Sequence, residues 1–411
     1  MNPQAVSGLT PSAAVDPAAF AIGGVVPRLA WRPADADQVA EAMRAASRDR
    51  LAVVPWGAGV ALAHEPAPQR YDVALDLSAL DRIVEYDPED FTLTAQCGAG
   101  IAALRATLAA RGLELPLEAA LASRATLGGV LAADASGPRR LRFGAPHDRI
   151  LGARFVLADG TQVRSGAKVV KNVAGYGTHR LLCGSRGGLA VMVEASIKLA
   201  PAPGARVALC YGADPAGLRD VARWAAFPRL EPSLVSVVEA SLAAGLAAAI
   251  VAPYLVVIGL EDDRPRVSEL ERAVTATLGA PVSRLEGDDA AALWQSLADL
   301  EETEGPRLSF TTAANTPAAL APLLATTAAA RLVFHAPAGR LHLFPGEADA
   351  QAVIEAVAAH GFTLIGARGL ATFQPSPPRQ IGVLALRARI RAALDPSGTL
   401  VLGGAWAAGT R

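Results

Sequence analysis

The sequence predicts an α+β protein with two main domains. The chain has 411 residues, more than one compact hydrophobic core usually holds. Short strand-like and helix-like segments with glycine-rich turns fill the first half, and the composition changes after Pro201-Ala202-Pro203-Gly204. Beyond it, strands and helices alternate in a pattern typical of an antiparallel sheet with helices on one face. We therefore expect a flexible segment over 1–25, a first domain over 26–202, a second over 203–370, and a C-terminal tail and helix over 371–411.

The first domain opens with a helix and then a strand that runs into a glycine-rich turn. Apolar residues at helical spacing predict a helix that begins at Trp31 and ends at Arg50. The apolar run over 51–55 predicts a strand, and Trp56-Gly57-Ala58-Gly59-Val60 follows directly. Glycine at positive φ lets consecutive amides converge on one anion, so this loop is a candidate phosphate site. A plain tight turn would need the same residues.

Further short elements follow. Strands are predicted over 73–77, 83–86 and 91–97, and a helix over 101–108 that ends at Arg111-Gly112. Apolar residues alternate along the segment 148–163, and Asp159-Gly160 interrupts the alternation. This pattern predicts a β-hairpin. No Gly-x-Gly-x-x-Gly sequence opens a βαβ unit, which disfavours a Rossmann dinucleotide site.

The centre of the domain is rich in small residues over 125–137. Gly128-Gly129 would let a neighbouring backbone or a flat ligand come close, because no side chain stands between them. Ser136-Gly137 adds a hydroxyl and an amide, and Arg140, Arg142 and Gly144 place cationic donors beside a turn. An Ala/Gly-rich helix that packs tightly on a sheet would also account for this composition.

Two more motifs follow: Lys171-Asn172-Val173-Ala174-Gly175-Tyr176 and Gly184-Ser185-Arg186-Gly187-Gly188. The order and spacing of all these motifs resemble those of a known family. The chain resembles the FAD-binding domain of the vanillyl-alcohol oxidase/p-cresol methylhydroxylase (PCMH) superfamily, and within it the FAD-binding E subunit of bacterial glycolate oxidase. The resemblance extends from Trp31 to Pro201 and is weak beyond. It implies an α+β fold: a two-subdomain PCMH-type FAD-binding domain followed by a cap domain with an antiparallel sheet and helices.

The resemblance also implies how the cofactor is held, because members of this family bind extended FAD mainly through backbone amides. The implied cofactor-binding residues are Gly57, Ala58, Gly59 and Val60 in the first loop, Thr126, Gly128, Gly129, Ser136, Gly137, Arg142 and Gly144 in the second segment, and Gly188 and Val191 in the third. Several members attach the flavin to a histidine. The first loop has no histidine before His64, so non-covalent FAD is expected.

Catalytic residues are not assigned by the sequence. Related catalytic subunits carry a His-x-Gly-Asp-Gly-Asn-x-His motif, and this chain has His335-Ala336-Pro337-Ala338-Gly339-Arg340-Leu341-His342. The histidine interval is kept, but Ala338 and Arg340 replace the acid and the amide. We therefore expect a vestigial motif or ordinary hairpin histidines and no metal, with a surviving catalytic pair as the alternative. The C-terminal family motif also departs here, at 395–404, which weakens the expectation that the tail docks.

Charge and cysteine content limit the partners. A formal net charge of -1 gives no basic excess for nucleic acid or an anionic membrane. Three widely spaced cysteines favour a reducing compartment and no iron–sulfur site in this chain. The first twenty residues lack Lys and Arg, unlike a signal peptide. The uncharged segment 241–260 is interpreted as a helix to Val251 and a buried strand over 254–258, not as a spanning helix.

The resemblance finally implies a function. The chain is expected to be the FAD-binding subunit of a glycolate oxidase that converts glycolate to glyoxylate, beside a catalytic FAD-containing subunit and an iron–sulfur subunit. The expected location is the cytoplasm, with the inner membrane reached only through partners. Two alternatives stay open: a free-standing, D-lactate-like 2-hydroxy-acid dehydrogenase, and a structural subunit that has lost the flavin.

Overall fold

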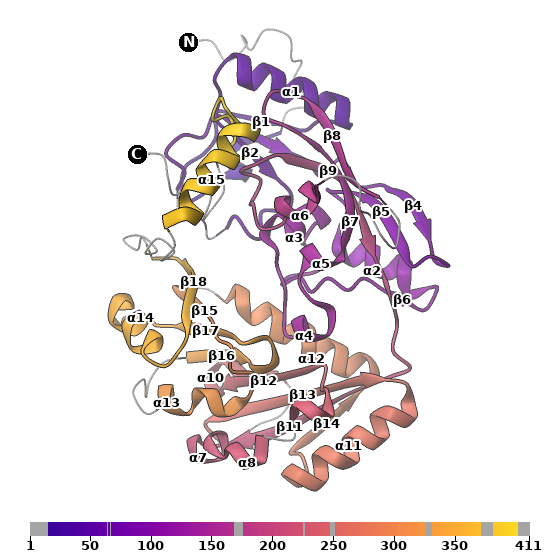
Figure 1. Cartoon of the computed structure of the whole chain (residues 1–411), viewed down its shortest axis with the longest axis vertical. Helices are drawn as coiled ribbons and strands as arrows, with labels where there is room; N and C mark the ends of the chain where they lie inside the picture. The colour runs from indigo at the N-terminus through magenta and orange to yellow at the C-terminus, as the bar shows by residue number, and fades with distance from the viewer. Residues whose placement is uncertain are drawn as a thin grey trace. The chain divides into compact units, whose positions relative to one another are not determined.

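The computed structural model describes residues 15–63, 65, 67–167, 176–224, 227–246, 251–303, 305–324, 331–370 and 381–401. The chain divides into two compact units, coloured by residue number in Figure 1. The first unit comprises Met1–Ala135, Ala145–Pro201 and Ser376–Arg411, and the second comprises Ser136–Gly144 and Ala202–Pro375. The division after Pro201 lies one residue before the boundary expected from sequence. The segment 136–144 lies with the second unit, however, and the C-terminal segment lies with the first.

A small parallel sheet forms one part of the first unit. Its strands are β1 (Leu29–Trp31), β2 (Val53–Trp56) and β3 (Val73–Asp76), in the order β1-β3-β2. Helix α1 (Ala36–Arg48) begins after Asp35, whose side chain accepts a hydrogen bond from the amide of Gln38. The predicted start of this helix at Trp31 was wrong. Pro33 disfavours helical backbone in the residue before it, and Trp31 pairs with Leu75 in the sheet.

A five-stranded antiparallel sheet forms the other part of the first unit. The strand order is β4-β5-β9-β7-β8. The bounds are β4 (Ile83–Asp87), β5 (Thr92–Gln96), β7 (Ile150–Val156), β8 (Gln162–Gly166) and β9 (Val191–Lys198). Strands β7 and β8 form the predicted hairpin, and Gly160 in its turn has φ of +83°. Two sheets in one unit fit the two subdomains that were expected.

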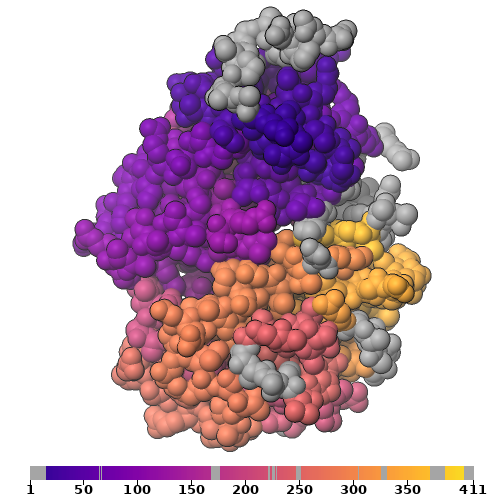
Figure 2. All heavy atoms as spheres, turned by 180° about the vertical axis from the view of Figure 1, so that it is seen from behind, coloured from indigo at the N-terminus to yellow at the C-terminus, as the bar shows by residue number. Residues whose placement is uncertain are grey.

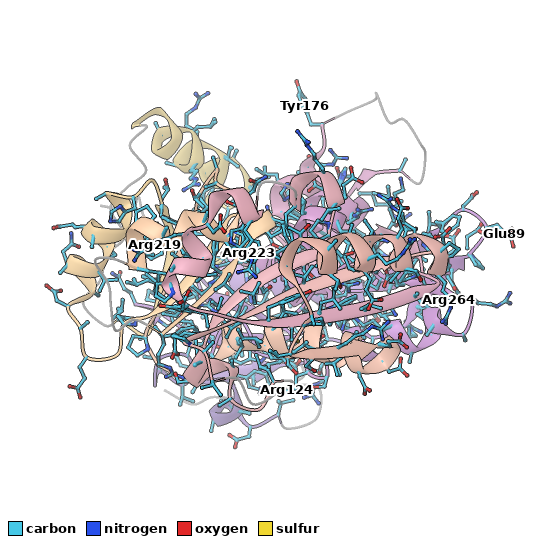
Figure 3. All side chains as sticks on the ribbon, turned by 90° about the horizontal axis from the view of Figure 1, so that it is seen from below. Glu89, Arg124, Tyr176, Arg219, Arg223 and Arg264 are labelled. Atoms are coloured by element: carbon cyan, nitrogen blue, oxygen red, sulfur yellow. The ribbon has the colours of Figure 1, made fainter. Side chains whose placement is uncertain are left out.

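Short elements complete the first unit. They are η1 (Pro17–Phe20), α2 (Ile101–Ala109), β6 (Leu113–Glu114), α3 (Leu127–Ala133), α5 (Pro146–Arg149), α6 (Thr178–Leu182) and β10 (Ala200–Pro201). Strand β6 pairs with β10, and α2 and α3 pack in one apolar cluster with β5 and β9. Tyr176 is 95% exposed and points outward in Figure 3. The neighbouring motif residues 171–175 lie outside the described part.

The C-terminal segment docks on the first unit, contrary to the weakened expectation from its sequence. After α15 (Ile381–Leu394), the buried carboxylate of Asp395 accepts hydrogen bonds from the amides of Thr399 at 2.9 Å and Leu400 at 2.8 Å. Leu400 then forms a parallel bridge with Val53 of β2. The turn at Asp395 and the backbone hydrogen bonds between Val53 and residues Thr399 and Val401 thus hold the described tail on the first unit.

An eight-stranded antiparallel sheet forms the centre of the second unit, in the order β14-β11-β13-β12-β16-β17-β15-β18. Its strands are β11 (Ala205–Ala213), β12 (Leu234–Glu239), β13 (Tyr254–Asp262), β14 (Ser283–Glu286), β15 (Arg307–Thr311), β16 (Arg331–His335), β17 (Arg340–Phe344) and β18 (Thr363–Arg368). The sequence predicts strands over 234–238, 254–260, 308–312, 331–334 and 340–344, which correspond to β12, β13, β15, β16 and β17, whereas β11, β14 and β18 were not predicted. This sheet confirms the antiparallel second domain.

Helices cover both faces of this sheet, so the expectation of helices on one face was wrong. Helix α11 (Arg264–Leu278) packs with Val256 and Ile258 of β13 in one apolar cluster. Helix α12 (Gly287–Asp299) packs with Leu255 and Val257 in another. The run 255–260 has no polar alternation because successive side chains enter two different cores. Arg264, at the start of α11, projects outward in Figure 3.

The remaining elements of the second unit are short: α4 (Arg140–Phe143), α7 (Pro215–Arg219), α8 (Val221–Trp224), α9 (Phe227–Leu230), α10 (Ala240–Ala243), η2 (Leu300–Glu302), η3 (Pro317–Leu320), α13 (Ala321–Leu324), η4 (Ala336–Ala338) and α14 (Ala350–Ala358). Figure 2 shows the orange segments near residue 300 as a continuous surface of this unit. The helix predicted to reach Val251 ends at Ala243 within the described residues. Over the described ranges, no helix is both long enough and apolar enough to cross a membrane.

Candidate functional site

The first predicted cofactor loop follows β2 and is held open by its glycines. Gly59 has φ of +76°, which places its carbonyl where it accepts the amides of Leu62 and Ala63. Among the described residues, the consecutive amides of Gly57, Ala58, Gly59 and Val60 donate no hydrogen bond. Half-buried amides normally find an acceptor, so four successive free donors form a site suited to an anion.

The second predicted segment contacts this loop at the hydroxyl group of Thr126. Thr126 caps α3, and its Oγ1 accepts the amide of Gly129 at 3.3 Å. A Cβ atom added to Gly57 would lie 2.3 Å from this Oγ1, and one added to Gly129 would lie 3.1 Å from it. The structure therefore brings Gly57, Thr126 and Gly129 together, although 69 positions separate the first two in the sequence.

Gly128 has a different role from Gly129. Its amide donates to the carbonyl of Cys97 at 2.7 Å, and an added Cβ would lie 2.8 Å from Cys97 Cβ and 2.9 Å from Cys97 O. Gly128 thus allows α3 to pack directly on the chain after β5. The same helix, α3, is therefore both the Ala/Gly-rich helix that packs on a sheet and part of the segment proposed to bind the cofactor. The two interpretations of this sequence do not exclude each other.

The third segment precedes β9. The amide of Gly188 donates to Ser185 O at 2.9 Å, and Gly187 has φ of +75°. The buried Oγ of Ser185 has no hydrogen-bond partner in the part of the chain that the structure describes. Val191 begins β9 and is 1% exposed in an apolar cluster, so only its backbone could reach a ligand.

Four predicted ligands lie on the segment 136–144 of the second unit. Ser136 accepts a hydrogen bond from Arg140, and Gly137 O accepts the amide of Arg140 at 3.1 Å. Gly144 ends α4 with φ of +75°. The guanidinium of Arg142 pairs with Glu261, Nε to Oε1 at 3.0 Å.

The cysteines and His64 give no further ligands. Cys97, Cys183 and Cys210 form no disulfide. Burial is the main cause that raises the pKa of the Cys183 thiol to about 12 and that of the Cys210 thiol to about 11, so both stay protonated near neutral pH. His64 lies outside the described residues.

The second unit contains a cluster that the sequence did not reveal. His335 ends β16 and His342 lies in β17, and the two form the predicted hairpin pair. Their Nδ1 atoms lie 2.8 Å from Ser236 Oγ and 3.0 Å from Ser309 Oγ. Their Nε2 atoms lie 3.9 Å and 3.5 Å from Oε1 of Glu301. Glu301 thus supplies a carboxylate that the motif itself lacks.

This cluster could hold a divalent ion by distance, but neighbouring charges oppose it. One ligand atom from each of Glu301, His335 and His342 lies within 4.8 Å of the others. Tetrahedral zinc with bonds of about 2.0 Å separates its ligand atoms by roughly 3.3 Å. The positive charge of Arg307 stabilises the carboxylate of Glu301. The positive charge of Arg340 contributes to the lowered pKa of His335. Both cations repel a metal ion at this position.

These groups also have shifted pKa values. Burial is the main cause that lowers the pKa of His335 to about 4, against the opposing effect of Glu301. Burial alone would raise the pKa of Glu301, but His342, Arg307 and His335 together lower it to about 2. At neutral pH the cluster therefore holds a carboxylate beside a neutral His335.

We expect folding stability to fall as the pH drops from 6.5 to 4. Over this interval the unfolded chain binds a proton on His335 that the folded chain does not, so the contribution is fully present above pH 6.5. This shift in the pKa of His335 should lower the free energy of unfolding by about 2 kcal/mol between pH 7 and pH 4.5. Urea unfolding in EDTA should show a smaller pH dependence for His335→Asn over this interval. An unchanged pH dependence would contradict the assigned protonation.

The comparisons with known proteins agree with the geometry of the first unit. Residues 27–166 match the family model described as "FAD binding domain". Glycolate oxidase subunit GlcE of Escherichia coli is 40% identical over 136 residues, 33% of this chain and 39% of that protein. Glycolate oxidase subunit GlcD of Bacillus subtilis is 32% identical over 171 residues, 42% of this chain and 36% of that protein. The chain therefore covers well under half the length of these relatives.

Solved structures show the same fold across most of the chain. A p-cresol methylhydroxylase structure has a TM-score of 0.72 at 15% identity and covers 92% of this chain and 88% of that chain. An alkyldihydroxyacetonephosphate synthase has a TM-score of 0.66 at 16% identity, with 92% and 77% covered. The fold is thus of the PCMH type, as expected, and FAD is the cofactor of the domain. The free amides of residues 57–60 and the close approach at Thr126 fit that cofactor.

Proposed function

We propose that this chain is the FAD-binding subunit of a glycolate-oxidising complex. The observation that carries the proposal is the convergence of the 57–60 loop and α3 at Thr126, with four free amides beside it. The names of the relatives supply the substrate class, since glycolate oxidase subunits and a D-2-hydroxyglutarate dehydrogenase are among them. When bound to this chain, FAD would supply a two-electron carrier for the oxidation of such an acid by the complex.

In this proposal the chain binds and orients the cofactor without a covalent bond. Backbone amides of the first loop hold the anionic part of FAD, and the cap of α3 keeps the second segment in place. Ser136, Gly137, Arg142 and Gly144 add contacts from the second segment, and Gly188 and Val191 from the third. The cysteines offer no iron–sulfur ligand set, so electrons that leave this flavin need another protein or a soluble acceptor. The partners proposed are a catalytic FAD-containing subunit and an iron–sulfur subunit.

Purification of the untagged complex from its source tests this function. We expect partner chains to co-purify, and glycolate to bleach the visible flavin spectrum. If the chain purifies alone and still reduces dye with a 2-hydroxy acid, it is a free-standing dehydrogenase. The buried Glu301–His335–His342 cluster is the observation that favours this second candidate. The support for FAD argues against a subunit that has lost the flavin.

We propose further that the histidine pair carries no chemistry and holds no metal. A His335→Ala/His342→Ala double variant should leave glycolate-dependent dye reduction by the reconstituted complex within a few-fold of the parent. Loss of a true general base typically removes about 10²–10⁴-fold. Metal analysis by mass spectrometry should find no stoichiometric ion in the parent. A loss of that size in a variant that folds, binds FAD and assembles would make this chain the dehydrogenase.

A further inference from the structure

A buried carboxylate in the second unit is surrounded by three arginines. Glu261, near the end of β13, has a side chain with no exposed surface. Arg139 Nη1 lies 3.0 Å from its Oε2, Arg142 Nε lies 3.0 Å from its Oε1, and Arg206 Nε lies 3.5 Å from its Oε2. Arg142 Nη1 also donates to the backbone carbonyl of Glu261 at 3.0 Å. One carboxylate thus organises three cations.

Two of these arginines belong to the segment 136–144, and Arg139 contacts one aromatic ring within the segment and one outside it. The guanidinium of Arg139 lies 4.7 Å from the ring centre of Phe143 and 5.4 Å from that of Trp294 in α12. Phe143 is 5% exposed. Arg206 differs because it comes from β11, opposite Glu261 in the sheet register. Figure 1 shows α4 of this segment beside the strands of the second unit.

Because Glu261 carries the negative charge that three arginines share, the attachment of the segment 136–144 to β13 depends on this residue. A buried ion pair that loses one member leaves an uncompensated charge, which is strongly unfavourable. Here Glu261→Gln would remove the negative charge that Arg139, Arg142 and Arg206 share and keep three positive charges close together. Their mutual repulsion would be lowest if Arg139 and Arg142, which lie on a short connecting segment, moved away from β13.

We propose that Glu261 is a positioning residue for FAD binding. It fixes Arg139 and Arg142, and with them the conformation of residues 136–144, where four of the proposed cofactor contacts lie. This inference rests on the proposed function, because it assumes that these residues contact FAD. Glu261 itself touches no cofactor and acts through the segment.

The test uses Glu261→Gln, which removes the charge and keeps the shape. We expect the FAD dissociation constant, measured by flavin fluorescence, to rise roughly tenfold or more. Limited trypsin digestion of the apoprotein should cleave faster after Arg139, Arg140 or Arg142, because the segment is released. Glu271→Gln, which breaks a partly exposed pair with Arg284, is the matched control and should change neither result.

Two more variants separate positioning from general stability. Arg139→Ala should weaken FAD binding, whereas Arg206→Ala removes a contact to the same carboxylate from outside the segment and should leave FAD affinity near that of the parent. Glu261→Asp keeps the charge and should lie nearer to the parent than to Glu261→Gln. Arg139→Ala also keeps the test decisive if Glu261→Gln does not fold.

The possible outcomes distinguish the positioning role of Glu261 from the proposed function as an FAD-binding subunit. Equal FAD affinity in the parent, Glu261→Gln and Arg139→Ala overturns the positioning role, whatever trypsin does. An equal loss in Arg139→Ala and Arg206→Ala overturns it too, since stability alone would explain the change. A folded parent that binds no FAD contradicts the proposed function instead.

Discussion

A Gly129→Val variant is expected to lose FAD while it keeps its fold. Outside its own helix, an added Cβ at this position meets one atom of the described residues within 4 Å, Thr126 Oγ1 at 3.1 Å, so a shift of a few tenths of an ångström in this hydroxyl accommodates it. The γ-methyl groups would then occupy space beside the 57–60 loop, where we place the cofactor. Bulk inserted into a packed site typically costs about 1–3 kcal/mol. In FAD affinity this corresponds to a loss of roughly 5- to 150-fold.

The measurement is FAD titration of the apoprotein by fluorescence, with circular dichroism to check the fold. Ala133→Val is the matched control, because it places the same side chain in the last turn of the same helix. Gly128→Val should behave differently and destabilise the fold, since its Cβ meets the backbone of Cys97 at 2.9 Å. Parent-like FAD affinity in Gly129→Val would show that no cofactor lies beside this residue.

Asp395→Ala is expected to destabilise the first unit by about 2–4 kcal/mol. The variant removes the acceptor for the amides of Thr399 and Leu400, both buried, and a hydrogen bond to a charged group contributes about 1.5–3 kcal/mol. The parallel bridge between Leu400 and Val53 would lose its support. The melting temperature should fall by about 5–15 °C.

Differential scanning calorimetry measures this change, and Ser397→Ala is its control. Ser397 is exposed, and its hydroxyl lies 3.2 Å from Asp395 Oδ1, 2.8 Å from Thr399 Oγ1 and 3.2 Å from Ser47 Oγ, so water can replace these contacts and its loss should cost less than the loss of the buried carboxylate. A melting temperature for Asp395→Ala within one or two degrees of the control would mean that the tail contributes little to the fold.

Local patterns in the sequence predicted much of the first unit. The Asp159-Gly160 turn determined the β7–β8 hairpin, and the glycines at 57, 59, 128 and 129 marked the two segments that meet. Each of these signals depends on residues within a few positions of one another. The meeting point at Thr126 could come only from the resemblance, because no spacing rule joins residues so far apart.

Local sequence patterns predicted less of the second unit. Strand β11 follows Pro203-Gly204, and its buried apolar run over 207–211, directly after Arg206, does not by itself distinguish a strand from a buried helix. Glu261 precedes Asp262 and Asp263, and such an acidic run usually marks a solvated turn. Asp263 does cap α11 in this way, but Glu261 is still in the strand and faces inward.

Glu301 could not be found from the sequence for a related reason. It lies 34 positions before His335, in η2 directly after α12, and only the sheet order brings β16 and β17 to it. The motif comparison therefore detected the loss of the acid and amide between the histidines but not the carboxylate nearby.

The account depends most directly on whether this chain itself holds FAD without a covalent bond. The measurement is acid precipitation of the purified, folded chain, followed by absorption and fluorescence of the supernatant and the pellet. We predict a yellow supernatant with the fluorescence of FAD and a colourless pellet. Flavin that remains with the pellet would contradict non-covalent binding, and a folded chain that yields no flavin from either fraction, even after incubation with FAD, would contradict the central claim.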